Sequence, residues 1–270
     1  MQAVVLHEHG GPEVLSVEEV PRPLPGPGQV CIRVRAVALN RLDLWVRGGL
    51  PGLRLEYPHR LGSDIAGEVV ELGAGVDPKQ LGREVLVNPG YGCGACEHCL
   101  DGWDNLCRYY KILGENTQGG YGQYTVVPAA NLLPRPEGMA WTQAAALPLT
   151  FLTAWQMLVV RAQVRAGDVV LMHAAGSGVG SAGLQIAKLH GAKVIALAST
   201  QAKLDKAEEL GADACICSAD EDWEQQVRAL PFVGKRGVDI VFEHPGEPFG
   251  RWDDPAAGST WREVRGCRLL

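Results

Sequence analysis

Four cysteines lie close together near the middle of the chain, and their spacing indicates a metal site. They follow one another as C-x2-C-x2-C-x7-C, at Cys93, Cys96, Cys99 and Cys107. Four thiolates this close can surround one Zn²⁺ as a tetrahedron, with each sulfur about 2.3 Å from the metal. Such a shell leaves no position open to a substrate. We therefore predict one structural zinc ion and expect the chemistry elsewhere.

Two other interpretations of these cysteines stay open at this point. A small disulfide knot would pair thiols across two-residue loops, which strains the backbone. A redox-active C-x-x-C pair would need only two of the four thiols. A proline and several glycines between positions 89 and 102 permit the sharp turns of a loop wrapped around a metal.

A glycine-rich turn in the second half of the chain indicates a nucleotide site. It lies between the apolar run 169–174 and a helical pattern that ends at Gly191, and it consists of Ala175, Gly176, Ser177, Gly178, Val179 and Gly180. Such a turn lets the backbone approach a pyrophosphate and directs helix N–H groups at its charge. The alternative is a tight turn from strand to helix that binds no ligand.

The end of the next predicted strand favours one nicotinamide cofactor over the other. NAD-specific sites usually place an acidic residue there, which binds the ribose 2′-hydroxyl. This chain instead has Ser199 and Thr200, followed by Lys203. Hydroxyls and a cation suit a 2′-phosphate, so the sequence favours NADP(H) over NAD(H). The alternative for Lys203 is a solvent-exposed lysine without a ligand.

The first half of the chain is rich in predicted strands. Alternating, β-branched runs lie at 2–6, 14–20, 30–39, 65–72 and 83–87. One short helix is predicted at 40–47. The pattern predicts a compact, barrel-like β domain into which the cysteine lobe is inserted.

The second half alternates helices with continuous apolar strands. Helices are predicted at 142–162, 178–190, 201–210 and 220–230. Strands are predicted at 169–174, 193–198, 213–217 and 238–242. This alternation predicts an α/β fold with a doubly wound parallel sheet. The last two dozen residues fit neither pattern, and we expect a truncated or out-of-frame end there; a folded extension is the alternative.

Composition narrows the function classes. The 270-residue chain has a net charge of −6 and no block of lysine or arginine, which argues against nucleic acid and anionic membranes as partners. Its first residues do not resemble a signal peptide. The most apolar window, 144–160, is interrupted by a proline and polar residues and is typical of a buried helix. Scattered further cysteines suit a reducing compartment, so we expect a cytoplasmic protein.

With these features in this order, the chain resembles the medium-chain dehydrogenase/reductase superfamily, which includes zinc alcohol dehydrogenases and quinone oxidoreductases. The resemblance is carried by GPEVL, RLGSDIAGEVVELGAGV, the cysteine lobe, LPLTFLTAWQML, HAAGSGVGSAGLQIAK and KAEELGAD. It implies a GroES-like catalytic domain at 1–130 with a structural-zinc lobe at about 89–110. An incomplete Rossmann domain would follow at 131–246, with an atypical tail at 247–270.

The resemblance also implies partners and further contacts. Catalysis is expected between the two domains, on a small carbonyl substrate, and relatives are dimers or tetramers. Thr153 is a further candidate cofactor contact. His244 lies at a predicted strand end beside the cofactor, where a histidine that satisfies loop groups is the favoured interpretation.

The chain departs from the zinc alcohol dehydrogenases at the catalytic metal. By motif alignment, the three ligand positions are occupied by Asn40, Ser63 and Leu149, and a leucine, Leu42, replaces the hydroxyl of the proton relay. An amide, a hydroxyl and a hydrocarbon cannot replace two thiolates and an imidazole. Asn40 instead resembles the quinone oxidoreductase-like members.

The sequence therefore favours an NADPH-dependent reductase of quinones, enones or similar carbonyls that uses no catalytic metal. We expect Asn40 to donate a hydrogen bond to the substrate carbonyl, with Ser63 and Asp64 nearby. The alternative for Asn40 is a loop residue that satisfies backbone groups. For the whole chain, the alternatives are a non-catalytic nucleotide-binding fragment and, less favoured, a zinc alcohol dehydrogenase.

Overall fold

The computed structural model describes residues 1–235, 237–243 and 262–264. They belong to two compact units, Met1–Leu149 and Thr150–Leu270. The first unit extends beyond residue 130, where the sequence suggested a boundary. The reason is local packing, because Ala144 and Ala145 lie against Ala66 and Leu86 of the first unit's sheet.

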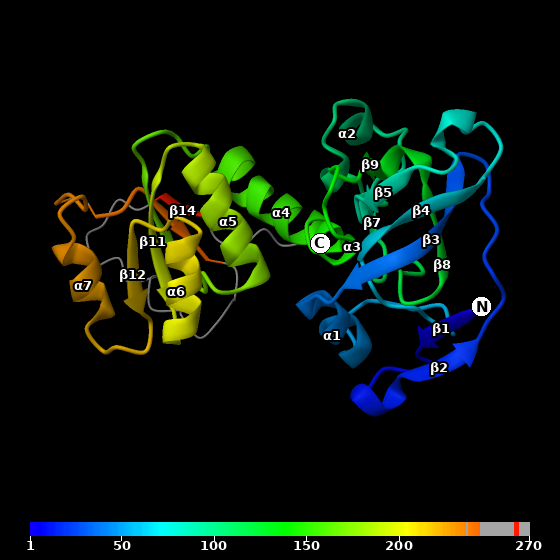
Figure 1. Cartoon of the computed structure of the whole chain (residues 1–270), viewed down its shortest axis with the longest axis horizontal. Helices are drawn as coiled ribbons and strands as arrows, with labels where there is room; N and C mark the ends of the chain where they lie inside the picture. Colours follow the sequence, from blue (N-terminus) through cyan, green and yellow to red (C-terminus); the bar gives the residue numbers. More distant parts are fainter. Residues whose placement is uncertain (236, 244–261, 265–270) are drawn as a thin grey trace. The chain divides into compact units, whose positions relative to one another are not determined.

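The first unit is built on a five-stranded antiparallel sheet (Figure 1). In spatial order its strands are β8 (Tyr124–Pro128), β3 (Gln29–Ala38), β4 (Asp64–Leu72), β5 (Glu84–Val87) and β9 (Leu132–Pro134). The side chains of Ile32, Ile65 and Val85 are completely buried in its core. The sequence predicted β3, β4 and β5 but missed β8 and β9, which are short and carry little alternation.

Smaller elements complete this unit. Two hairpin-like pairs are β1 (Gln2–Val5) with β2 (Ser16–Glu19) and β6 (Gly90–Tyr91) with β7 (Lys111–Ile112). The α-helices are α1 (Arg41–Gly48), α2 (Glu97–Leu100) and α3 (Trp141–Ala145). Short 3-10 turns lie at Pro12–Val14, Pro78–Gln80, Asp104–Leu106 and Ala129–Asn131.

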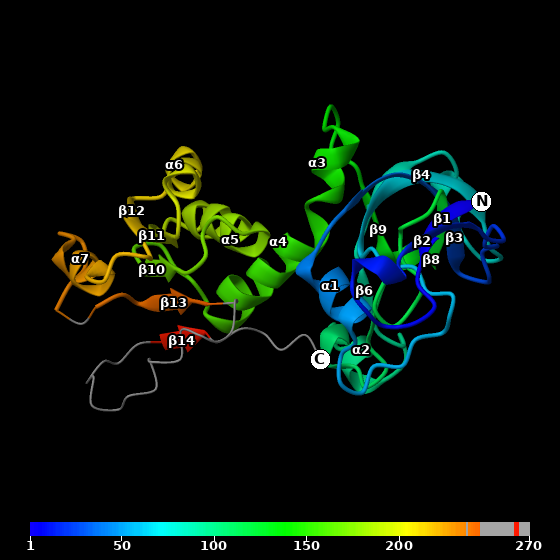
Figure 2. The same cartoon turned by 90° about the horizontal axis from the view of Figure 1, so that it is seen from below.

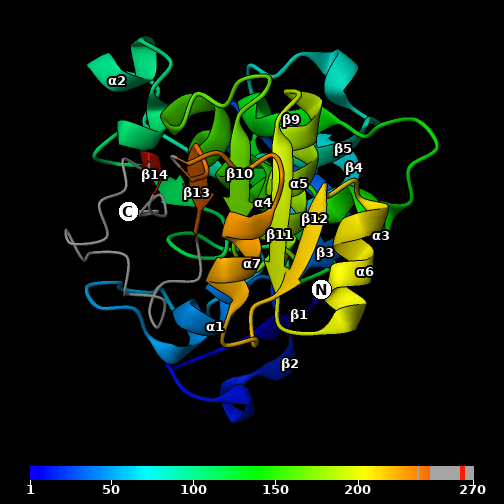
Figure 3. The same ribbon diagram turned by 90° about the vertical axis from the view of Figure 1, so that its left-hand side faces the viewer.

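The second unit is a parallel sheet in the order β12-β11-β10-β13-β14, and Figure 3 looks onto its first four strands. The strands are β10 (Val169–Met172), β11 (Lys193–Ala198), β12 (Ala214–Cys217), β13 (Ile240–Phe242) and β14 (Arg262–Val264). The connecting helices are α5 (Gly178–Leu189), α6 (Gln201–Glu209) and α7 (Trp223–Ala229).

The strands β10 to β13 bury alternate side chains on opposite faces of this sheet. On β10, Val170 and Met172 pack with Leu184 of α5, whereas Val169 and Leu171 pack with Val227 of α7. Both faces are therefore covered, which is why the strands read as continuous apolar runs. The predicted α/β class and parallel sheet are confirmed.

The tail departs from the sequence prediction at one place. We expected no strand between 247 and 270, yet the backbone of β14 pairs in parallel with β13 (Figure 2). A three-residue strand is too short for periodicity to detect.

The long helix predicted at 142–162 is interrupted. A bend at 146–147 separates α3 from α4 (Pro148–Trp155), and a π-helical stretch, Gln156–Arg161, follows. Pro148 explains the break, because a proline disfavours helical backbone at the preceding residue. By length and composition Trp141–Arg161 could cross a membrane, with 39% of its most apolar window buried. Met157 and Leu158 lie fully inside the second unit's core, as expected of a core segment.

Candidate functional site

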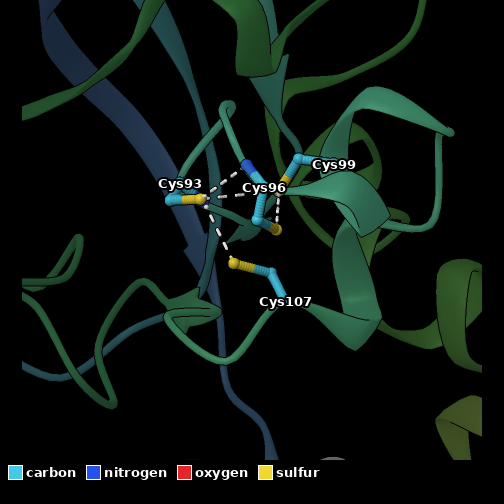
Figure 4. Close-up of side chains that lie close together, drawn as sticks. All are labelled: Cys93, Cys96, Cys99 and Cys107. Carbon is cyan, nitrogen blue, oxygen red and sulfur yellow. Dashed lines mark hydrogen bonds between the residues drawn. The ribbon is translucent and has the colours of Figure 1, made fainter.

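The four lobe cysteines converge in the structure as their spacing predicts (Figure 4). Their sulfur atoms all lie within 4.8 Å of one another, with Cys96 Sγ and Cys99 Sγ 3.5 Å apart. A tetrahedral zinc site with bonds of about 2.3 Å requires sulfur atoms about 3.8 Å apart. All described cysteines are free thiols, so the disulfide knot is excluded for the lobe. The donor set and its spacing fit one Zn²⁺.

Backbone N–H groups donate to two of the sulfurs, whereas burial raises the pKa of a third thiol, Cys99, to about 12. The N–H of Cys96 donates to Cys93 Sγ at 3.4 Å, and the N–H of Tyr109 donates to Cys107 Sγ at 3.3 Å. Hydrogen bonds from the backbone of Ala95 and Cys96 lower the pKa of Cys93 to about 6. Thiolates are the form that binds metal.

A glycine next to the first cysteine makes room for the site. A Cβ at Gly92 would lie 2.5 Å from Cys99 Sγ and 3.1 Å from Cys107 Cβ. Only glycine lets the backbone pass this close to the ligands.

The three positions that align with catalytic-zinc ligands also come together, around one carboxylate. Asp64 Oδ2 accepts a hydrogen bond from Asn40 Nδ2 at 2.9 Å, and Asp64 Oδ1 accepts one from the Leu149 N–H at 2.7 Å. Ser63 precedes Asp64 and is 1% exposed. Its Oγ is buried and has no hydrogen-bond partner among the described residues.

The sheet register explains this convergence. Ala38, the last residue of β3, pairs with Asp64, the first residue of β4. Asn40 follows two residues after β3 and is the N-cap of α1. Antiparallel pairing therefore brings residues 24 positions apart in the chain to the same end of the sheet.

A second buried acid, Asp43, holds the same loop. Asp43 Oδ2 accepts the N–H of Asn40 at 2.7 Å, and Asp43 Oδ1 accepts the N–H of Gly62 at 3.0 Å. Burial raises the pKa of Asp43, and burial also raises the pKa of Asp64 to about 6, with a smaller contribution from the Asp43 charge. Asp43 thus belongs to the site. Its spacing of three residues from an N-cap was the available signal.

This site does not offer a ligand set for zinc. Asn40, Ser63 and Leu149 contribute an amide, a hydroxyl and a hydrocarbon, as the sequence indicated. In the part of the chain that the structure describes, only the four lobe cysteines bring three or more Cys, His, Asp or Glu ligand atoms together.

The glycine turn has the geometry of a phosphate-binding turn. Ser177 is the N-cap of α5, and its Oγ accepts the N–H of Gly180 at 2.9 Å. A Cβ at Gly180 would lie 2.2 Å from the carbonyl oxygen of Ala174. Glycine is therefore required for the helix to start this close to the end of β10. The exposed positions Gly176 and Gly178 leave the turn open.

The residues after β11 lie beside this turn. Ser199 and Thr200 are exposed, and Thr200 is the N-cap of α6. A Cβ at Gly176 would lie 2.7–2.8 Å from Lys203 side-chain carbons, so the Lys203 stem lies directly against the turn. The structure thus brings the predicted cation and the predicted pyrophosphate site together.

Two further predicted cofactor residues have different outcomes. Thr153 is on α4 and half-buried, but the residue whose methyl group approaches the turn is Thr150, 2.9 Å from a Cβ built at Gly178. Sequence reasoning missed Thr150, which lies one helical turn earlier. His244 lies outside the described residues.

Comparisons with known proteins match both units. Residues 26–137 match the alcohol dehydrogenase GroES-like domain, and residues 178–249 match the zinc-binding dehydrogenase family. An NAD-dependent alcohol dehydrogenase of Sulfolobus acidocaldarius is 34% identical over 92% of this chain and 72% of its own length. The quinone oxidoreductase of Homo sapiens is 28% identical over 90% of this chain and 66% of its own length.

Solved structures agree with the sequence matches. The crystal structure of an NAD-dependent alcohol dehydrogenase superposes with a TM-score of 0.88 at 52% identity, covering 91% of this chain and 71% of that protein. The chain therefore spans roughly two thirds of the length of the relatives it matches. Both the alcohol dehydrogenase and the quinone oxidoreductase branches are represented.

Proposed function

Because the chain belongs to the medium-chain dehydrogenase/reductase superfamily, we propose that it is an NADPH-dependent oxidoreductase that reduces a quinone, an enone or a similar carbonyl without a catalytic metal. The observation that carries the proposal is the Asp64 cluster. Its carboxylate is occupied by the Asn40 amide and the Leu149 N–H, where a zinc enzyme would need metal ligands.

The chain's own residues bind and polarise the reactants. Asn40 donates an N–H to the carbonyl oxygen, where negative charge develops, and the buried Ser63 hydroxyl is a second donor. The α5 N-terminus and the glycine turn hold the pyrophosphate, and Lys203 holds the 2′-phosphate. Bound NADPH supplies the hydride, and water supplies the proton that completes the reduction. The lobe cysteines hold a zinc ion that stabilises the fold and takes no part in the reaction.

NAD-linked alcohol oxidation is the competing function, because relatives with that name match the chain at 34% and 52% identity. It requires a second metal site. Two bound zinc ions per chain, together with NAD-dependent alcohol oxidation, would establish it over our proposal. NADPH binding without oxidation by any quinone or enone would instead indicate a non-catalytic protein.

Asn40→Ala tests the proposal. We expect kcat/KM for NADPH-dependent enone reduction to fall about 100-fold, the usual effect of losing one donor to a developing oxyanion. The rate is followed by NADPH absorbance, and the matched control is Asn116→Ala, an exposed asparagine of the same unit. Unchanged turnover in Asn40→Ala would show that the amide does not act on the substrate.

Lys203→Glu tests the cofactor preference. One pair of unit charges about 4 Å apart interacts by about 1–4 kcal/mol at effective dielectric constants of 80 to 20, and reversing the lysine charge costs about twice that, so we expect KM for NADPH to rise about 30-fold or more. KM for NADH should change little. The control is Lys206→Glu on the same helix, because Lys206 Nζ already pairs with Glu209 at 2.6 Å. An equal effect on both cofactors in Lys203→Glu would contradict the 2′-phosphate assignment.

A further inference from the structure

We propose that Asp64 is a positioning residue that fixes which face of the Asn40 amide meets the substrate. This inference rests on the proposed function, in which Asn40 donates a hydrogen bond to a carbonyl. It adds a residue that the substrate never touches but on which the donor depends.

The hydrogen bond between the two side chains determines the orientation of the amide. Carboxylate oxygens only accept hydrogen bonds, so the NH₂ end of Asn40 must face Asp64 Oδ2, 2.9 Å away. One of the two Nδ2 hydrogens is used in this contact. The second hydrogen is then fixed in the plane of the amide and is the one that can reach a carbonyl.

Asp64 is itself held in place by the backbone. Its Oδ1 accepts the Leu149 N–H at 2.7 Å, and the residue is 1% exposed at the start of β4. The Asn40 backbone is held separately, because its N–H donates to Asp43. One buried acid thus fixes the backbone of Asn40 and the other fixes its side-chain amide.

The two buried carboxylates, Asp43 and Asp64, do not favour folding. Both acids are buried, and in the described part of the chain no lysine or arginine contributes a neighbouring positive charge to either. Buried carboxylates without a cation are costly. The position of two such acids around one amide fits a site that orients a donor.

Asp64→Asn keeps the size of the side chain but changes which of its atoms donate and which accept hydrogen bonds. It therefore tests the orientation of the Asn40 amide without changing the packing. The Leu149 N–H would select the oxygen of the introduced amide, which leaves its NH₂ group facing Asn40. Two NH₂ groups cannot hydrogen-bond to each other, so Asn40 must turn over and offer its oxygen instead. We expect kcat for enone reduction to fall at least 10-fold, with the Kd for NADPH unchanged within twofold.

Two further variants show whether a loss of kcat in Asp64→Asn comes from the orientation of the Asn40 amide. Asp77→Asn is the matched control, since Asp77 accepts one backbone N–H from Lys79 at an exposed turn of the same unit, and we expect wild-type kcat. The double variant Asn40→Asp/Asp64→Asn restores a hydrogen bond between the two positions with donor and acceptor exchanged. We expect it to stay as slow as Asp64→Asn, and recovery of wild-type turnover would overturn the proposal.

A spectroscopic measurement tests the contact without requiring turnover. The chain contains five asparagines, so selective ¹⁵N-asparagine labelling gives five side-chain NH₂ pairs, and Asn40→Ala identifies the pair from Asn40. Among the residues that the structure describes, Asp43 is the only charged group that contributes to the Asp64 titration, and Asn40 and Leu149 are neutral. We expect one Asn40 proton to shift with a midpoint near pH 6, and the shift to disappear in Asp64→Asn.

The two measurements distinguish the possible failures. An Asn40 pair that neither titrates between pH 5 and 8 nor changes in Asp64→Asn would overturn the positioning role. If the titration is present but Asn40→Ala keeps full turnover, the contact exists and the proposed function fails. If Asn40→Ala is slow and Asp64→Asn is not, the positioning role alone fails.

Discussion

Loss of the lobe zinc is expected to lower the melting temperature by about 10 °C or more, since each kcal/mol of stability corresponds to about 2–4 °C in a chain of this size. In small zinc-binding domains, a structural zinc ion contributes about 10 kcal/mol or more of binding free energy. Here the metal would hold only one lobe of a larger protein, so we expect its removal to cost a fraction of that free energy. The melting temperature is measured before and after chelation, with zinc content determined in parallel.

We expect the lobe to depend on a bound metal because the lobe has almost no core of its own. Leu100 is 74% exposed and Tyr109 is 64% exposed, and helix α2 has only four residues. Apolar burial therefore cannot hold the loop closed, and the metal–sulfur bonds must do so. We expect chelation to make the chain sensitive to protease between Cys93 and Cys107 while both sheets remain folded.

The substitution Cys107→Ser weakens the zinc site by mutation instead of by chelation. It removes one buried ligand, and Cys217→Ser is the control because Cys217 is a free thiol at the end of β12, in the other unit. We expect one zinc per chain in wild type and control, and less in Cys107→Ser. Equal zinc content and equal melting temperature in all three proteins would contradict the structural assignment.

Gly180→Ala is expected to abolish cofactor binding and to destabilise the second unit by about 1–3 kcal/mol, the usual cost of overpacking. The new Cβ would lie 2.2 Å from the carbonyl oxygen of Ala174 and 2.9 Å from Ala175 Cα. Backbone atoms cannot move aside as a flexible side chain can, so α5 must shift away from β10. The N–H groups that would face the pyrophosphate move with it.

Binding is measured by the change in NADPH fluorescence, and stability by urea unfolding. Gly183→Ala is the matched control on the same helix, because its Cβ would meet the side chains of Phe242 and Met172 at 3.0 Å or more. We expect Gly183→Ala to lose some stability but to keep its affinity for NADPH. Normal NADPH affinity in Gly180→Ala would show that the turn is not the phosphate site.

Several features of this protein follow from local sequence alone. The cysteine spacing predicts the sulfur cluster because ligands so close in the chain have few other ways to be arranged. The glycine turn, the strand before it and the helix after it form one continuous segment, so the geometry of the turn could also be predicted. Continuous apolar strands indicated the parallel sheet because both of its faces are covered.

The tertiary structure decided the features that depend on distant residues. β8 and β9 are strands because β3 and β5 pair with them, and their own patterns are weak. Lys203 meets Gly176 only because β10 and β11 are neighbours in the sheet.

The candidate catalytic site belongs to the same class. The sequence placed Asn40, Ser63 and Asp64 near one another by resemblance, but no local pattern showed that Asp64 binds both the Asn40 amide and the Leu149 N–H. The register of β3 with β4 brings Asn40 to Asp64, and the Leu149 N–H reaches the same carboxylate from 85 positions away in the chain. The sequence by itself determines which chemical groups are present. The tertiary structure decides which group a buried carboxylate binds, because its partners come from distant parts of the chain.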